Sequence, residues 1–310
     1  MSVLIIKINS TGDVARTTTL LRRLEGGNVT WVSAPHNTVL LERQSTNVRC
    51  LAWEERRRAH DRAYDLVINL EDQHEVACFA AELRYKQLFG AYLNSEQTVG
   101  YTDDSRRWFD LSLISVHGRV EADRLKLQNR RTYQDLIFEG LGFHFAGEKY
   151  LLPQPAVTDL VGDVALAPTA GPVWPMKGWA YYGELKLELE AQGLRVNMLP
   201  NRSSLLDHLS DVQNHRCLVS GDSLPMHLAL GTGTPCVTLF NCTSPWEIYD
   251  YGVQTKIVSP LLDKFFYKRS FDPRATKAIG VEEVFDAVMA RLNGAGDDTN
   301  GEVRNEPGRK

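Results

Sequence analysis

The sequence predicts a doubly wound α/β protein made of two Rossmann-like halves. Three observations support this fold class. Short β-branched runs alternate with longer helical patterns, several of the short runs are apolar almost throughout, and the alternation restarts near the middle of the chain. Parallel strands covered by helices on both faces read as continuous apolar runs, so the pattern is typical of mainly parallel sheets.

The individual elements follow from run length and periodicity. The predicted strands are Val3–Ile8, Val29–Ala34, Leu66–Leu70, Leu111–Val116, Val164–Ala167, Arg195–Met198, Cys217–Ser220 and Pro235–Phe240. The predicted helices are Thr17–Leu24, Glu75–Leu88, Arg130–Leu141, Tyr181–Gln192, Ser203–Ser210, Pro225–Leu230 and Val281–Leu292.

A linker divides this pattern into two domains. The segment Lys149–Asp163 carries two prolines and interrupts the alternation before a fresh strand begins. We therefore predict an N-terminal domain over residues 1–155, a C-terminal domain over residues 156–292 and a tail over residues 293–310. The tail is polar, Gly-rich and free of aromatic residues, so we expect it to be disordered.

Composition narrows the function classes. The net charge of −4 favours neither nucleic acid nor an anionic lipid surface. No apolar run is long enough to span a membrane, and the N-terminus lacks the pattern of a signal peptide. Five scattered cysteines without a C-x-x-C motif argue against a disulfide framework or a zinc site. We expect a cytoplasmic protein with reduced thiols and no metal.

Ligands of open α/β sheets bind at the carboxyl ends of the strands, so the residues there are the candidates for chemistry. After the first strand come Lys7, Ser10, Thr11, Gly12 and Asp13. Gly12 suits a tight turn, and Asp13 falls near the N-cap of a helix expected to begin around Val14. Asp13 is therefore either a helix cap or an ionised carboxylate that acts as a general base in the cleft.

The stretch VSGDSLPMHLALGTGTP presents a second strand end with two interpretations. Gly221–Leu224 spells the signature of a serine-hydrolase family, which would make Ser223 a nucleophile. Pro225 suits the first turn of a helix, whose free N–H groups form an anion site beside Ser223, Leu224 and His227. Asp222 would then contact sugar hydroxyls, unless Asp222 and Ser223 only cap the helix and His227 only packs in the core.

Four ordered segments resemble one enzyme family over about residues 3–290. They are VLIIKINSTGDVARTTTLLRRL, YDLVINLEDQ, LAPTAGPVWPMKGWAYYGELKLELEAQG and VSGDSLPMHLALGTGTPCVTLFNCTSPWEIYDYG. Their strand-Lys-Ser-Gly-Asp-Val, Tyr-Asp-Leu-Val-Ile, Trp-Pro and Gly-Thr-Pro patterns resemble those of glycosyltransferase family 9, the heptosyltransferases.

The resemblance implies a GT-B fold, with two facing Rossmann-like domains and the site between them. It implies metal-free, cofactor-free inverting transfer of a heptose or related sugar from an ADP-sugar to an acceptor hydroxyl. Asp13 matches the family's proposed base. Lys7, Ser10, Thr11 and Gly12 would border the acceptor, and the donor would meet Asp222, Ser223, Leu224, His227, Lys177 and Thr243.

This sequence departs from the family at its phosphate site. Leu224 stands where the family has Gly, and Pro172 and Val173 stand where it carries Lys or Arg before Trp-Pro. Lys177 and Arg16 are candidates for the missing cation.

Three functions remain open at this stage. A serine hydrolase has little support, because His227 is the last histidine and no Asp-x-x-His follows Ser223. A non-catalytic nucleotide-sugar binding protein is compatible with the missing cation, whereas Asp13 favours a transferase. The acceptor is either lipopolysaccharide core, reached by peripheral contact with the inner membrane, or a small soluble metabolite. We expect a monomer that binds no nucleic acid.

Overall fold

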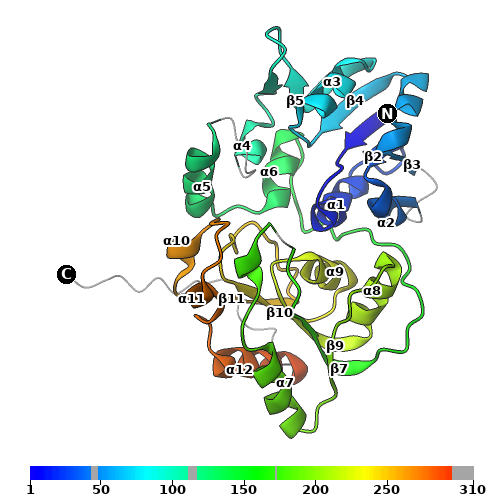
Figure 1. The fold of residues 1–310 in the computed structure, drawn as a ribbon. Helices are drawn as coiled ribbons and strands as arrows, with labels where there is room; N and C mark the ends of the chain where they lie inside the picture. The colour runs from blue at the N-terminus through cyan, green and yellow to red at the C-terminus, as the bar shows by residue number, and fades with distance from the viewer. Residues whose placement is uncertain (43–47, 111–116, 172, 295–310) are drawn as a thin grey trace.

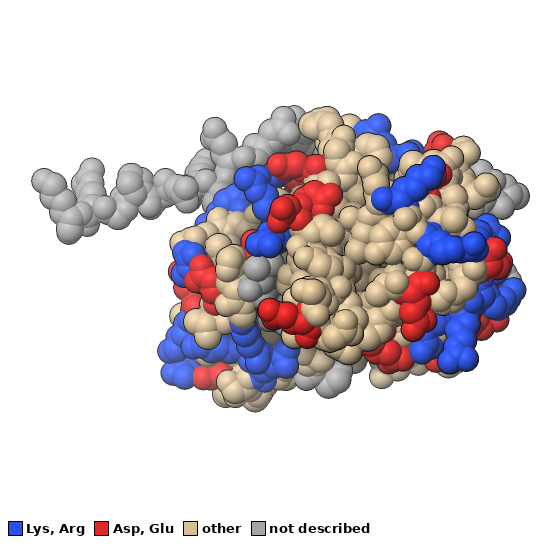
Figure 2. Space-filling view, turned by 90° about the horizontal axis from the view of Figure 1, so that it is seen from above, with Lys and Arg blue, Asp and Glu red and all other residues tan. Residues whose placement is uncertain are grey.

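The chain folds around two separate β-sheets. The computed structural model describes residues 1–42, 48–110, 117–171 and 173–294. Figure 1 shows the N-terminal sheet and its helices in the upper part of the molecule and the C-terminal sheet and its helices below. Figure 2, from above, shows basic and acidic side chains interspersed over this face of the molecule.

The N-terminal sheet has six strands in the order β3-β2-β1-β4-β5-β6. Its strands pair in parallel except for the antiparallel pair β5–β6. The strands are β1 (Ser2–Ile6), β2 (Asn28–Ser33), β3 (Val48–Ala52), β4 (Tyr64–Asn69), β5 (Tyr85–Leu93) and β6 (Val99–Tyr101). The C-terminal sheet has five parallel strands in the order β11-β10-β9-β7-β8. They are β7 (Gly162–Ala167), β8 (Val196–Met198), β9 (His215–Gly221), β10 (Cys236–Phe240) and β11 (Gln254–Val258).

Helices cover both faces of each sheet. Those of the first half are α1 (Thr11–Thr17), α2 (Val39–Glu42), α3 (His74–Ala81), α4 (Arg106–Phe109), α5 (Arg119–Gln128) and α6 (Tyr133–Gly140). Those of the second half are α7 (Tyr182–Ala191), α8 (Leu205–Gln213), α9 (Leu224–Thr232), α10 (Leu262–Phe265), α11 (Pro273–Thr276) and α12 (Val281–Leu292). Short 3-10 turns include η1 (Thr18–Arg22) and η4 (Pro175–Lys177).

Each sheet separates two apolar cores. Along β1, Val3 and Ile5 enter one core while Leu4 and Ile6 enter the other. Successive side chains of a strand point to opposite faces, so a continuous apolar run is what two-sided burial requires. The prediction of two doubly wound, mainly parallel halves is therefore confirmed.

Several element predictions need correction. The predicted helix Glu75–Leu88 is wrong beyond Ala81, because Tyr85–Leu93 forms β5. The predicted helix Thr17–Leu24 begins earlier, at Thr11, and continues only as a 3-10 turn. The predicted strand Leu111–Val116 and residues 295–310 of the predicted tail lie outside the described residues.

The boundary at residue 155 stays a prediction. Between Met1 and Gly294, the described helices include none that combines the length and the apolar character needed to cross a bilayer.

Candidate functional site

A cavity of about 750 Å³ lies where the ends of β1 and β4 face those of β7, β9 and β10. All of the site residues selected from the sequence line it: Lys7, Ser10, Thr11, Gly12, Asp13, Lys177, Asp222, Ser223, Leu224, His227 and Thr243. They come from both halves of the chain. The fold therefore brings the two predicted sets together in one cavity, while their individual roles stay predictions.

Asp13 lies in the first turn of α1, which begins at Thr11 rather than near Val14. Its carboxylate forms an ion pair of 2.8 Å with Arg16, one turn along the same helix, and is 30% exposed to the cavity. Burial would raise the pKa of Asp13, but the charges of Arg16 and Lys7 outweigh burial and lower it. Asp13 is thus an ionised carboxylate that is partly exposed in the cavity, and the helix-cap interpretation is wrong because Ser10 occupies the N-cap position.

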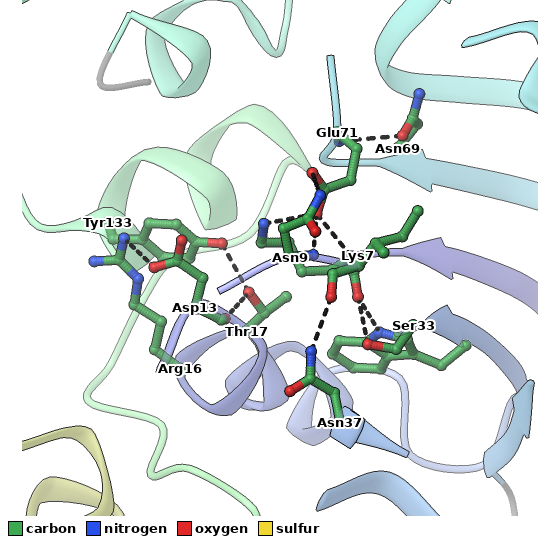
Figure 3. A network of polar contacts seen from close by, with 12 residues as sticks. Lys7, Asn9, Asp13, Arg16, Thr17, Ser33, Asn37, Asn69, Glu71 and Tyr133 are labelled. Carbon is green, nitrogen blue, oxygen red and sulfur yellow. Dashed lines mark hydrogen bonds and ion pairs between the residues drawn. The ribbon is translucent and has the colours of Figure 1, made fainter. Parts of the chain in front are cut away.

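Arg16 is held in place from two sides. Its guanidinium carbon lies 3.7 Å from the centre of the Tyr133 ring, and the Tyr133 hydroxyl lies 2.7 Å from the Thr17 hydroxyl. Thr17 in turn donates to the main-chain oxygen of Asp13 (Figure 3). Because its charge is already paired with Asp13, Arg16 is a poor substitute for the missing phosphate cation.

Lys7 and Glu71 form a buried ion pair of 2.8 Å beneath the turn after β1. The same Glu71 oxygen accepts hydrogen bonds from the main-chain N–H groups of Ile8 and Asn9, at 2.7 and 2.8 Å. Figure 3 shows Lys7, Asn9 and Glu71 converging at this point. A carboxylate shared in this way orders the turn that leads to Asp13. Lys7 thus lines the cavity with its ammonium engaged by Glu71.

Gly12 allows α1 and α9 to meet across the two halves. A Cβ on residue 12 would stand 2.5 Å from Cδ2 of His227, closer than real contacts permit. The tight turn expected at Gly12 occurs instead at Ser10, whose φ is 62°. The glycine is required here by helix packing rather than by a turn.

His227 is a buried, neutral histidine. Its Nδ1 lies 3.2 Å from the Tyr150 hydroxyl, and only 5% of the residue is exposed. Burial, followed by the charge of Arg16, lowers the pKa of His227 to about 4. The main-chain N–H of His227 donates to the Ser223 carbonyl at 3.4 Å, but within the described part of the chain the His227 ring makes no hydrogen bond with the Ser223 hydroxyl. The hydrolase interpretation therefore lacks the nucleophile–base contact that it needs.

Gly221 and Lys177 fix the other wall of the cavity. A Cβ on Gly221 would collide with the carbonyl oxygen of Lys177, so the glycine admits the η4 turn against the end of β9. Lys177 then reaches Asp222, with 2.9 Å between Nζ and the carboxylate. Burial opposes ionisation of Asp222, but the Lys177 ammonium outweighs it and lowers the pKa to about 2. Asp222 is an ion-pair partner rather than a helix cap.

The start of α9 opens onto the cavity. Ser223 is its N-cap residue, and Pro225 lies in the first turn as predicted. The Ser223 hydroxyl makes no capping bond and instead donates to the carbonyl of Gly221 at 3.3 Å. The N-cap side chain of α9 thus leaves the first main-chain N–H groups of the helix without a capping bond. Such a helix start is suited to bind an anion, because these N–H groups and the helix dipole face the ligand.

Several residues that line the cavity were not predicted from the sequence. Lys126 and Tyr133 come from α5 and α6, and Tyr267 and Arg269 follow α10. None of them follows a strand directly, so the strand-end criterion could not select them. The helical pattern of Arg119–Gln128 is the signal that could have drawn attention to Lys126.

Comparisons agree with this geometry. The family model "Glycosyltransferase family 9 (heptosyltransferase)" matches residues 173–265. No curated protein matches the chain. Among solved structures, a glycosyl transferase family 9 protein from Veillonella parvula has a TM-score of 0.66 at 14% identity, covering 94% of this chain and 97% of its own.

Two E. coli structures are also similar. Heptosyltransferase WaaC with ADP has a TM-score of 0.63 at 15% identity, covering 94% of this chain and 100% of its own. ADP-heptose lps heptosyltransferase II has a TM-score of 0.61 at 15% identity, covering 95% of this chain and 99% of its own. These likenesses confirm the GT-B fold, and the family model confirms the resemblance proposed from the motifs. Residues 173–265 thus match glycosyltransferase family 9, within a whole-chain fold like that of the family's solved structures, and this match supports glycosyltransferase activity.

Proposed function

We propose that the protein transfers a heptose or a related sugar from an ADP-activated donor to an acceptor hydroxyl, with inversion at the anomeric carbon. The observation that carries this proposal is the ionised carboxylate of Asp13 in the same cavity as the start of α9. A base and an anion site in one cavity are the two parts that a direct displacement needs.

In the proposed step, Asp13 accepts the proton of the acceptor hydroxyl while the hydroxyl oxygen forms a bond to the anomeric carbon. The bond between that carbon and the diphosphate oxygen breaks, and the nucleoside diphosphate leaves with the electron pair. One displacement inverts the configuration. The N–H groups and dipole of α9 stabilise the charge that develops on the leaving phosphate, so we propose that no metal takes part.

The donor side of the proposal uses the residues around α9. Asp222, ionised by its pair with Lys177, accepts hydrogen bonds from hydroxyls of the donor sugar. Ser223, Leu224 and Thr243 border the phosphates, and His227 supplies a neutral ring. Leu224 and Thr11 also line a neighbouring cavity of about 580 Å³.

The acceptor side consists of the turn after β1. Ser10, Thr11 and Gly12 line the cavity beside Asp13, above the pair of Lys7 with Glu71. Both acceptor classes remain in the proposal: lipopolysaccharide core, with peripheral contact to the inner membrane, or a small metabolite. We also propose that the protein works in the cytoplasm as a monomer, without a cofactor or nucleic acid.

A non-catalytic nucleotide-sugar binding protein is the second candidate, favoured by Val173 at the position of the family's cation and by the pairing of Arg16 and Lys177 with carboxylates. One experiment separates the two. Calorimetry with ADP-, UDP- and GDP-sugars identifies the donor, and the same donor is then incubated with candidate acceptors. The transferase proposal expects ADP-heptose to bind and a product of inverted configuration to form. Binding of a nucleotide sugar without turnover of any acceptor would favour the second candidate.

A further inference from the structure

The cations of the cavity fall into two groups. Its Lys and Arg side chains are Lys7, Arg16, Lys126, Lys177 and Arg269. Lys7, Arg16 and Lys177 each pair with a carboxylate. Across the residues that the structure describes, neither the Lys126 ammonium nor the Arg269 guanidinium forms an ion pair or a hydrogen bond. The positive charge available to a ligand therefore comes from these two side chains.

Lys126 is buried without a counter-charge in contact. It belongs to α5, on the N-terminal side of the cavity, and is only 3% exposed. Its ammonium lies 4.0 Å from the centre of the Tyr267 ring, on the C-terminal side. Lysine is seldom buried unless it is paired, because desolvation of the ammonium is costly. A cavity-lining ammonium of this kind is suited to an anionic ligand that enters the cavity.

Arg269 stands at the rim of the same site. It is exposed, and its guanidinium carbon lies 5.3 Å from the centre of the Trp174 ring. Trp174 and Tyr267 contact each other edge to face, with 5.2 Å between ring centres. The two cations thus flank one aromatic pair, which has Lys126 on Tyr267 and Arg269 on Trp174.

This aromatic pair adjoins the donor residues. Trp174 precedes the η4 turn that carries Lys177, and the N–H of Tyr267 donates to the carbonyl of Cys242 at 2.8 Å, next to Thr243. Tyr267 has a φ of 49°, which is uncommon for a residue other than glycine and is found at functional sites. Figure 1 shows α5 opposite α10, and Leu127 of α5 packs against the apolar cluster of Leu262, Phe266 and Tyr267.

We propose that Lys126 and Arg269 together bind the diphosphate of the donor and replace the cation that this chain lacks before Trp174. The inference rests on the proposed function for the identity of the diphosphate. It has a structural consequence, because Lys126 comes from the N-terminal half and Arg269 from the C-terminal half. The diphosphate then connects the two halves of the enzyme.

Two carboxylates near Lys126 reduce the positive charge that it offers to a ligand, without cancelling it. Glu247 lines the cavity and accepts a hydrogen bond from the Tyr267 hydroxyl at 3.1 Å. Burial lowers the pKa of Lys126, and the charges of Glu247 and of Asp123, which lies one turn earlier on α5, partly restore it. A bound diphosphate would raise the pKa of Lys126, as Glu247 does, because a nearby opposite charge favours the ammonium form.

The test measures the affinity of the full chain for inorganic pyrophosphate, ADP and adenosine by calorimetry. Lys126→Met and Arg269→Gln keep most of the side-chain bulk while they remove the charge. We expect each to weaken pyrophosphate and ADP binding roughly tenfold or more, because a charge-assisted contact is lost, and to leave adenosine binding unchanged. Lys126→Arg retains the charge and should restore most of the affinity.

Arg130→Gln is the matched control. The guanidinium carbon of Arg130 lies 3.7 Å from the centre of the Trp246 ring. Arg130 is therefore also an arginine on an aromatic ring, but it does not line the cavity. Thermal unfolding of every variant shows whether it folds. Diphosphate affinity that is unaffected by both Lys126→Met and Arg269→Gln overturns the inference, as does equal weakening by Arg130→Gln or a wild-type chain that binds no diphosphate. Diphosphate binding that depends on Lys126, in a protein without transfer activity, would instead contradict the proposed function and leave this inference standing.

Discussion

Gly12 and His227 lie in direct contact across the two halves of the chain, with no room between them for a methyl group. The contact joins α1, which carries Asp13, to α9, whose start is the proposed donor phosphate site. The distance between the proposed base and the proposed phosphate site therefore depends on a glycine.

Gly12→Ala should separate α1 from α9. We expect a loss of stability of roughly 1–3 kcal/mol from overpacking, together with a larger relative loss of transfer rate than of donor affinity. Thermal unfolding and steady-state kinetics measure both effects. Gly183→Ala in α7 is the control, because a Cβ there meets open space. Equal behaviour of the two variants would show that the close approach does not matter.

Asp13→Asn should abolish general-base catalysis while it preserves the shape of the cavity. We expect transfer to fall by roughly 100-fold to 10,000-fold, with little change in donor affinity. Product formation by mass spectrometry and donor titration by calorimetry give the two quantities. An unchanged rate would remove Asp13 from the mechanism.

Arg16→Gln should move the acid limb of the pH–rate profile to higher pH. Arg16 is the main influence that lowers the pKa of Asp13 below its usual value of 3.8, so its removal raises that pKa. The base must be ionised, and activity is then lost at a higher pH as acid is added. Arg22→Gln, six residues further at the end of η1 and outside the cavity, should leave the profile unchanged. A profile that stays in place in Arg16→Gln would contradict this electrostatic account.

Asp222→Asn should destabilise the protein at neutral pH. The pKa of Asp222 is depressed to about 2 from the ordinary 3.8, so its ionisation contributes stability above pH 3.8 that is lost as the pH falls toward 2. The contribution is about 2 kcal/mol at most. Denaturant unfolding at pH 7 and at pH 3 should show a smaller difference in the variant. Asp272→Asn is the matched control, since that carboxylate has a pKa near 2 through an exposed partner, Arg274.

Ser223→Ala distinguishes the two interpretations of Gly221–Leu224, as a phosphate site or as the signature of a serine hydrolase. A phosphate contact predicts a loss of donor affinity of roughly threefold to tenfold, the value of one hydrogen bond. It also predicts that a chromogenic ester is not hydrolysed by either protein. Ester turnover that disappears with Ser223 would revive the hydrolase interpretation.

The central strands could be predicted from the sequence, because their burial on both faces leaves a continuous apolar run. β1, β2, β4, β7, β9 and β10 are of this kind. β5 could not be predicted in this way, because its first residues, Tyr85–Gln87, are exposed and resemble the end of a helix. The edge strands β3, β6 and β11 are only partly buried, so their periodicity is weak, whereas the fourth edge strand, β8, falls within the predicted strand Arg195–Met198.

The sequence by itself determined the fold class, the family resemblance and the strand-end residues of the cavity, because these depend on local runs and motifs. Only the tertiary structure decided which charges neutralise one another. Lys7 and Glu71 are 64 positions apart, and their pairing arises from neighbouring parallel strands. Lys126 and Arg269 reach the cavity from a helix and a loop on opposite halves of the chain. Electrostatic partnership depends on distance in space and on burial, and neither can be read from the order of residues.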